Sequence, residues 1–522
     1  MSKSIYLINP SPDMPSYYST DVLTHLGFDP MAFIADLAIT TVAALVPADF
    51  DVEICDQYVS MVKLDYPADF VGITGKISQV GNMIKLAQEF RRRGKTVIIG
   101  GSFASLTPDA VRPYCDILVR GEIETIAPQL FADLKQGRWQ AEYTGDMPDL
   151  SLSPIPRWDL YPNHKALQGC IQTSRGCPFE CEFCDVIQYV GRKQRHKAVA
   201  QVLAELEVSY KLGYRHIFLA DDNFTVYRQR SKELLTALRD WNNRQTEGQV
   251  IFNTQLSIDT AKEDEILQLC FEAGLNEVFI GIEIPNEASL RESKKRQNLG
   301  INLVDQIQRF LDHGIEVFAG MIVGFDADGP DIFERQYEFA MSTPIPTFSL
   351  GALIAPSSTP LYQRLKQANR LESTTEAGAD ATPWETNIIP KQMTREELMV
   401  GLCWLGNRLY HPAAFGERLL RFIDSLNTPG RVNKVDNRPQ NREAVLRGTQ
   451  LIRRIPQLGP EESLMFSRVM KKVRQKPAAQ KQVMSILFRY MQIRYMYEQN
   501  RFWEPHLAEQ PAPDLSRKVT GN

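Results

Sequence analysis

Short apolar segments alternate with helical segments in two separate runs along this 522-residue chain. The first run, to about residue 145, holds five strand-like segments: SIYLINP, DFDVEICD, DFVGIT, TVIIGG and DILVRGE. The second, from Cys170 to about Tyr362, holds six: CIQTS, HIFLAD, VIFNTQ, EVFIGIE, IEVFAGMIVGF and FSLGALI. This alternation predicts an α/β fold with mostly parallel sheets.

The two runs predict two different domains. Five units over residues 1–145 are typical of a flavodoxin-like, Rossmann-type domain, which binds ligands at the carboxyl ends of its strands. Six units over residues 166–370 predict a partial (β/α)6 barrel of the TIM type, with its chemistry at the same ends. The proline-bearing stretch 146–165 is expected to be a linker. After the acidic stretch LESTTEAGADATP the pattern becomes helical, which predicts an α-helical C-terminal domain over 371–522.

Charge and cysteine usage exclude several classes of protein. The net charge is −4 and no basic patch dominates, so we expect no nucleic-acid partner. No stretch approaches the length of a membrane span or of a signal-peptide core. Five of the eight cysteines are scattered among apolar residues and three are clustered, which predicts a reduced, cytoplasmic chain with one cysteine site.

The clustered residues Cys177, Cys181 and Cys184 form a CxxxCxxC array just after the first strand of the predicted barrel. Three thiolates on one loop can ligate three irons of a cubane cluster. A ferredoxin-type carrier needs a fourth cysteine, and none is nearby, so one iron is left open to bind another molecule. A structural zinc site with His196 as the fourth ligand, or three unrelated buried cysteines, are the alternatives.

Because Phe183 precedes the last cysteine, the array resembles the CxxxCxΦC motif of the radical S-adenosylmethionine (SAM) superfamily, in which Φ is aromatic. The resemblance implies a [4Fe–4S] cluster on these cysteines that cleaves SAM reductively to a radical, so the cofactors carry the difficult chemistry. The segment GMIVGFD resembles the GxIxGxxE motif that backs the adenine of SAM, although Ala327 stands in place of the glutamate.

The resemblance also implies contacts to SAM. LADDNF places Asp221, Asp222 and Asn223 at the end of the second barrel strand, where the family binds the amino group of SAM and where carboxylates can pair with an ammonium. A capped helix start is the alternative interpretation. Further candidate contacts to the ribose and carboxylate are Gln255, Ser257 and Glu283. Arg175 either balances the charge of the cluster or caps a turn.

A flavodoxin-like domain ahead of such a barrel resembles the cobalamin-binding class of the superfamily, in particular the hopanoid C-2 methylase group with its helical C-terminal domain. The loops TGKIS and GGSFAS would then contact cobalamin, and the implied contacts are Thr74, Gly75, Ser78, Gly100, Gly101 and Ser102. The cobalamin motif DxHxxG is absent, and His25 is interpreted as an ordinary histidine. A domain that binds nothing is the alternative. The proline-rich loop PSPDMPSYYSTDV is expected to face the substrate.

The resemblance implies methylation of an unactivated carbon in a polycyclic, hopanoid-like lipid or another secondary metabolite, with no catalytic base and with a flavodoxin or ferredoxin as electron donor. The alternatives are a cyclase or rearrangement enzyme for a tetrapyrrole, a radical SAM enzyme without cobalamin, and a non-catalytic sensor. Near the C-terminus, an apolar helical face is more typical of core, yet Arg418 and Arg421 at its polar edge allow peripheral membrane contact. The aromatic residues considered for an apolar substrate pocket are Tyr362, Trp384 and Trp404.

Overall fold

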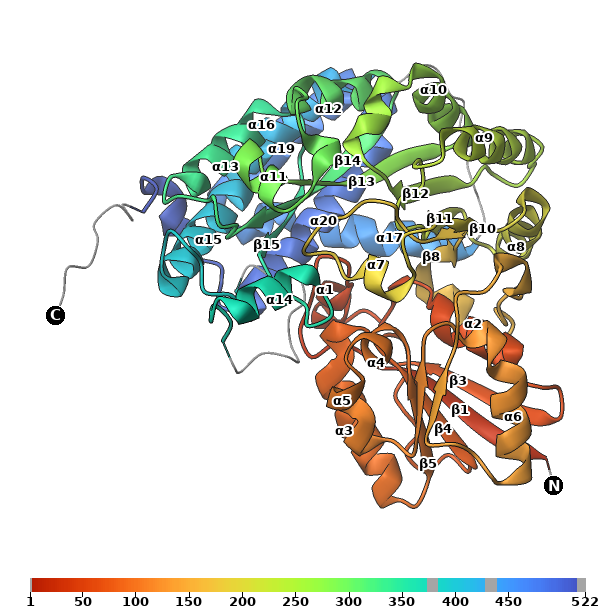
Figure 1. Ribbon diagram of the computed structural model, residues 1–522. Helices are drawn as coiled ribbons and strands as arrows, with labels where there is room; N and C mark the ends of the chain where they lie inside the picture. The colour runs from red at the N-terminus through yellow and green to blue at the C-terminus, as the bar shows by residue number, and fades with distance from the viewer. Residues whose placement is uncertain (1, 373–383, 428–438, 514–522) are drawn as a thin grey trace.

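The computed structural model describes residues 2–372, 384–427 and 439–513. Two parallel sheets follow one another along the chain, and a helical region packs against the second sheet (Figure 1). The predicted α/β class, with a flavodoxin-like domain, a partial barrel and a helical C-terminal region, is confirmed. Most of the acidic stretch that precedes the helical region, residues 373–383, lies outside the described residues.

The N-terminal sheet has six parallel strands in the order β3-β1-β4-β5-β6-β7. The first five strands follow the flavodoxin order 2-1-3-4-5, and the edge strand β7 was not predicted because three residues are too few to show a pattern. The strands are β1 (Lys3–Asn9), β3 (Phe50–Asp56), β4 (Phe70–Thr74), β5 (Thr96–Gly100), β6 (Ile117–Arg120) and β7 (Glu142–Thr144).

Helices cover both faces of this sheet and form two apolar cores. Helix α3 (Val80–Arg92) buries Met83, Ala87 and Phe90 at helical spacing on one face. Helices α2 (Leu37–Leu45) and α6 (Ala127–Gln136) cover the other face. In sheets of this topology, ligands bind at the carboxyl ends of the strands.

The second sheet has seven parallel strands in the order β15-β14-β13-β12-β11-β8-β2. The six predicted strands are present: β8 (Ala166–Ile171), β11 (His216–Leu219), β12 (Ile251–Gln255), β13 (Leu275–Glu283), β14 (Glu316–Val323) and β15 (Phe348–Ala352). Their outer face is covered by α8 (Val199–Lys211), α9 (Arg228–Asn243), α10 (Asp264–Ala273), α12 (Leu303–Asp312) and α13 (Ile332–Ser342). This arrangement is the partial barrel expected from the six units.

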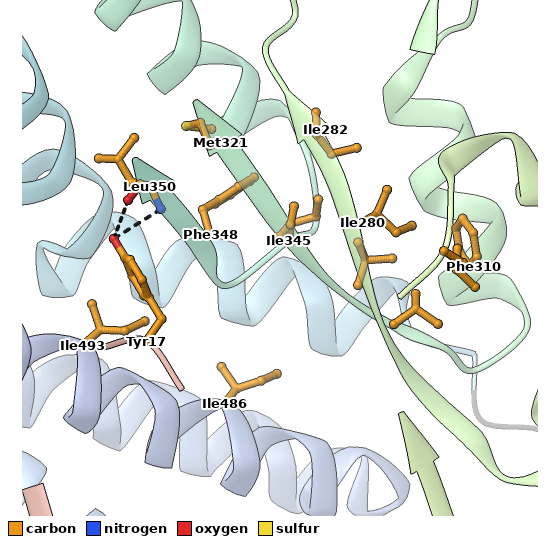
Figure 2. Close-up of a cluster of buried hydrophobic side chains, with 14 of the residues drawn as sticks. Tyr17, Ile280, Ile282, Phe310, Met321, Ile345, Phe348, Leu350, Ile486 and Ile493 are labelled. Carbon is orange, nitrogen blue, oxygen red and sulfur yellow. Dashed lines mark hydrogen bonds between the residues drawn. The ribbon is translucent and has the colours of Figure 1, made fainter. Parts of the chain in front are cut away.

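The seventh strand comes from the N-terminal run. A segment predicted to belong to the first domain, residues 1–145, thus contributes a strand to the second sheet. Strand β2 (Ala32–Ile34) pairs with β8 at one edge of the barrel sheet. At the other edge, the hydroxyl of Tyr17 donates to the carbonyl of Leu350 at 3.1 Å and accepts from its N–H at 3.2 Å (Figure 2). One segment of chain thus caps both open edges of the partial barrel, a long-range pairing that local periodicity cannot reveal.

The predicted linker, residues 146–165, is packed rather than free. Trp158 and Tyr161 are buried in the barrel core. The hydroxyl of Tyr161 donates to the carboxylate of Asp56, at the end of β3, at 2.6 Å. The stretch therefore holds the two sheets together.

The C-terminal region consists of α14 (Pro360–Gln367), α15 (Arg395–Tyr410), α16 (Pro412–Ser425), α17 (Pro439–Ile452), α18 (Ile455–Leu458), α19 (Pro460–Gln475) and α20 (Gln480–Gln499). Helix α20 lies against the barrel, with Ile486 and Ile493 near Tyr17 (Figure 2). In the described part of the chain, no helix combines the length and the apolar character needed to cross a membrane.

The prediction that Arg418 lies at a polar, lipid-facing edge of α16 is wrong. Arg418 is fully buried, and its guanidinium donates to the carbonyl of Leu409 at 2.6 Å and to that of Pro346 at 3.3 Å. Burial lowers its pKa to about 10. The guanidinium of Arg421 donates to the carbonyl of Met341. Arg418 satisfies buried backbone carbonyls, so its position on α16 belongs to the protein interior, whereas Arg421 is 35% exposed and also pairs with Glu417.

Candidate active site

The clustered cysteines lie on one loop that is closed at its base by a short antiparallel pair, β9 (Ser174–Arg175) and β10 (Arg195–His196). The N–H of Cys177 donates to the carbonyl of Gly191 at 3.2 Å. Gly176 has φ +103°, and a Cβ there would lie 2.6 Å from the carbonyl oxygen of Lys193. Only glycine fits this position, so the start of the cysteine loop is fixed by close backbone packing.

The donor set of this loop fits three irons of a cubane cluster. Burial raises the pKa of Cys177 to about 11 and that of Cys184 to about 12, so these thiols must lose protons when they bind iron. Among the residues that the structure describes, no three His, Cys, Asp or Glu side chains converge as they would around a single metal ion. The assignment of the thiols to a cluster therefore rests on the motif and on the family.

Asp221 is predicted to contact SAM, and in the structure its carboxylate also holds the backbone that leads into the cysteine loop. Asp221 is 2% exposed and accepts hydrogen bonds from the N–H and hydroxyl of Thr173 at 2.7 and 2.5 Å, and from the N–H of Ser174 at 3.0 Å. Asp222 accepts from the N–H of Gly176 at 2.8 Å. These aspartates hold the strand that leads into the cysteine loop. The SAM contacts expected of Asp221 and Asp222 stay predictions.

Three other residues predicted to contact SAM lie together just after β11 and at the end of β12. The amide of Asn223 donates to the hydroxyl of Ser257, and its carbonyl oxygen is buried with no partner among the described atoms. Gln255 ends β12 and is exposed. The unpartnered carbonyl oxygen of Asn223, close to the exposed amide of Gln255, could accept a hydrogen bond from a polar ligand. Asn223, Ser257 and Gln255 thus remain candidate SAM contacts.

Glu283 ends β13 in the left-handed region, with φ +62°. Its carboxylate forms a buried ion pair with Lys295, which lies on the segment after α11 (Glu287–Glu292). The pair lies beside the cysteine loop, because the ammonium of Lys295 is 5.8 Å from the ring centre of Phe183. Lys295 was not identified from the sequence, since a lysine in SKKRQN resembles any surface lysine.

Ala327 stands where the GxIxGxxE motif has a glutamate, but the next residue, Asp328, supplies a carboxylate to the same loop. Asp328 accepts hydrogen bonds from the N–H groups of Gly324 and Phe325, both at 2.9 Å, and from the hydroxyl of Ser289 at 2.6 Å. Glu292 accepts from the two N–H groups that follow, those of Asp326 and Ala327. The loop after β14 is thus held rigidly by two carboxylates although Ala327 replaces the motif's glutamate.

A cavity of about 460 Å³ opens where the carboxyl ends of both sheets meet. Five of the six residues predicted for cobalamin line it: Thr74, Gly75, Gly100, Gly101 and Ser102. Ser78 is not among the lining residues and lies in the turn before α3. Gly101 has φ +97°, and a Cβ there would lie 2.6 Å from the hydroxyl oxygen of Thr74, so glycine keeps the two loops in close contact.

The cavity continues as an apolar slot between the sheet and its helices. Leu7, Gly72, Ile98 and Val119 form one wall, and side chains of α2 and α6 form the other. No histidine lines the cavity in the part of the chain that the structure describes. Polar loop residues such as Thr74 and Ser102 at one part of the cavity and apolar side chains along the slot offer cobalamin both hydrogen-bonding and apolar surface.

Arg175 joins the cavity to the cysteine loop. Its guanidinium pairs with Glu122 at 2.5 Å and with Glu124 at 2.7 Å, and Arg195 also pairs with Glu122. All four side chains are largely buried, and both glutamates line the cavity. Arg175 was expected either to balance the charge of the cluster or to cap a turn. Instead, its ion pairs connect the N-terminal domain to the loop that carries the cysteines.

A second cavity of about 290 Å³ adjoins the first and shares Lys76, Ser102 and Tyr189 with it. Asp185 and Val186, directly after Cys184, line it on one side, and Ser357, Ser358 and Tyr362 line it on another. Of the three aromatic residues considered for a pocket, only Tyr362 lies here. Trp404 packs on Tyr337, and Trp384 packs on Tyr497 and Phe502.

Comparisons with known proteins agree with this geometry. Residues 171–340 match the radical SAM superfamily model, and residues 359–501 match a domain of unknown function, DUF4070. An uncharacterized methyltransferase of Synechocystis sp. is 34% identical over 80% of this chain and 78% of its own length. The hopanoid C-2 methylase of Rhodopseudomonas palustris is 32% identical over 66% of each chain.

The chain therefore belongs to the radical SAM superfamily, and the family predicted from the cysteine motif is confirmed. Two solved radical SAM enzymes share its fold. OxsB with aqua-cobalamin bound has a TM-score of 0.59 at 15% identity, over 96% of this chain and 80% of its own. TsrM from Kitasatospora setae, with tryptophan and a SAM analog bound, has a TM-score of 0.53 at 17% identity, over 73% and 80%.

Proposed function

We propose that this protein is a cobalamin-dependent radical SAM methyltransferase that acts on an unactivated carbon of a polycyclic, hopanoid-like lipid or a related secondary metabolite. One observation carries the proposal: a cavity suited to cobalamin lies directly beside the cysteine loop. Arg175, Tyr189 and Val190, on or beside that loop, line the same cavity as the glycine loops of the N-terminal domain. Two cofactors bound there would lie close enough to act on one substrate.

When bound, the cluster and SAM supply a hydrogen-abstracting radical, and cobalamin supplies the methyl group. The chain's own residues hold and enclose these groups. Asp221 and Asp222 fix the cysteine loop, and Arg175 fixes it relative to the cavity. Asn223, Ser257 and Gln255 are the proposed SAM contacts, and the loops at Thr74–Gly75 and Gly100–Ser102 are the proposed cobalamin contacts.

The second cavity is the proposed substrate site, because it touches both the cysteine loop and the first cavity. Its wall combines apolar side chains such as Phe103 and Val186 with the hydroxyls of Ser357 and Ser358. The hydroxyl of Ser358 is buried without a partner among the described atoms. This wall suits an apolar molecule with a polar end. Names of relatives support the same class, since two hopanoid methylases are among them.

The proposal includes a cytoplasmic location and reduction by a flavodoxin or ferredoxin. Any peripheral membrane contact would have to involve a surface other than the buried face of α16 around Arg418. Flotation with vesicles of anionic phospholipid tests it directly.

The function is tested with the anaerobically reconstituted protein, SAM carrying a deuterated methyl group, a low-potential reductant and diploptene as the polycyclic probe. Mass spectrometry should find the probe with one labelled methyl group added, together with 5′-deoxyadenosine. A Cys184→Ala variant should form neither product. Release of 5′-deoxyadenosine with no methylation of diploptene or of a tetrapyrrole probe would contradict methyl transfer to these substrates.

A further inference from the structure

The segment from Ser293 to Asn298 forms hydrogen bonds with the cysteine loop. The N–H of Glu182 donates to the carbonyl of Ser293 at 2.9 Å. The side-chain amide of Gln297 donates to the sulfur of Cys181 at 3.6 Å. At the far end, the amide of Asn298 donates to the carbonyls of Gly281 and Ile282, both at 3.0 Å. The segment is therefore fixed both to the loop and to strand β13.

Lys295, at the centre of this segment, brings a positive charge to the cysteines. Its side chain is 11% exposed, and its ammonium interacts electrostatically with the sulfurs of Cys181 and Cys184. The paired Glu283 lies on the barrel strand. A Cβ at Gly281 would collide with both charged groups, so this glycine makes room for the pair against the sheet. By contrast, the neighbouring Lys294 is exposed.

We propose that Lys295 and Gln297 set the reduction potential of the cluster that the proposed function requires. Reduction adds one electron from a low-potential donor to a cluster that already carries negative thiolate charge. A buried cation and an N–H···S hydrogen bond both stabilise the reduced form, because each interacts more strongly with the added negative charge. Glu283 acts in the opposite direction, and it also holds the ammonium in place.

The test is redox titration of the reconstituted, SAM-free protein, followed by electron paramagnetic resonance of the reduced cluster. Lys295→Met and Gln297→Leu should each move the midpoint to a more negative potential and lower the reduced fraction several-fold at a fixed potential near the wild-type midpoint. Glu283→Gln should move it to a more positive potential. Lys294→Met is the matched control and should titrate like the wild type.

Opposite signs for Lys295→Met and Glu283→Gln separate an electrostatic role from general damage to the loop. Iron analysis comes first: a wild-type chain without iron would refute the proposed cluster itself, whatever the role of Lys295. With iron retained, a midpoint for Lys295→Met equal to that of Lys294→Met would overturn the proposal. Should Lys295→Met fail to load iron, the signs of the shifts for Gln297→Leu and Glu283→Gln decide the question.

Discussion

The carboxylate of Asp222 accepts a hydrogen bond from the backbone N–H of Gly176 at 2.8 Å, one residue before the first clustered cysteine. Its neighbour Asp221 holds the two residues at the start of the same turn, Thr173 and Ser174. The end of β11 therefore positions the loop that follows β8, and the two strands are neighbours in the barrel. A motif expected to bind SAM also builds the cysteine site.

Replacing Asp221 with alanine should impair loading of iron. The substitution leaves two buried N–H groups and one hydroxyl without an acceptor, at a cost of about 1–3 kcal/mol for each group. We expect iron per chain after reconstitution to fall to less than about half of the wild-type value, measured on the folded fraction. Asp240→Ala, on the exposed side of α9, is the control and should load normally. Equal iron in both variants would show that the turn holds its shape without Asp221.

Loss of Arg175 should destabilise the whole chain. Arg175→Met leaves Glu122 and Glu124 buried with much of their charge unpaired, and breaking a buried pair in this way costs about 3–5 kcal/mol. Denaturant titration measures the change. The control is Arg157→Met, which breaks an exposed pair with Asp159 and should cost less than about 1 kcal/mol. Similar costs for the two variants would mean that Glu122 and Glu124 find other partners.

Filling the apolar slot should exclude cobalamin without affecting iron. A Cβ at Gly72 would lie 2.7 Å from a methyl carbon of Leu7, so Gly72→Leu projects a side chain into the slot. We expect affinity for hydroxocobalamin to fall at least about tenfold, which corresponds to about 1.4 kcal/mol. Absorbance after desalting reports cobalamin, and iron content serves as the internal control. Unchanged cobalamin binding would place the ligand outside the slot.

The titration of Asp328 should make stability depend on pH. Burial raises its pKa to about 6, against about 3.9 in an unfolded chain. Between these values the folded state holds a proton that the unfolded state has lost. The contribution of this group to the free energy of unfolding is therefore complete below about pH 4 and is lost as pH rises to about 6, at up to about 1.4 kcal/mol per pH unit.

Denaturant titrations at several pH values between 4.5 and 6.5 test this prediction. Asp328→Asn keeps an acceptor for the N–H groups of Gly324 and Phe325 but cannot titrate, so its stability should fall less steeply with rising pH than that of the wild type. Asp331→Asn, exposed in the same loop region, should keep the wild-type slope. Parallel curves for Asp328→Asn and the wild type would contradict the raised pKa.

The sequence predicts the architecture and the cysteine site because both follow from local patterns. Strand alternation is visible within each unit, and Cys177, Cys181 and Cys184 are close in the chain. The features that were missed depend on contacts between distant segments. Strand β2 joins β8 across more than a hundred residues, and Lys295 reaches the cysteine loop through the fold. Arg418 was wrongly placed at the surface because helical periodicity does not reveal which buried backbone carbonyls need a hydrogen-bond donor.

Metal analysis tests most directly whether one chain holds a cluster and cobalamin side by side. The protein is reconstituted anaerobically with iron, sulfide and hydroxocobalamin, desalted, and analysed for both metals. We predict about four irons and about one cobalt per chain, with only the iron lost in a variant whose three clustered cysteines are replaced by alanine. Four irons without cobalt would contradict the cobalamin site and with it the proposed methyl transfer.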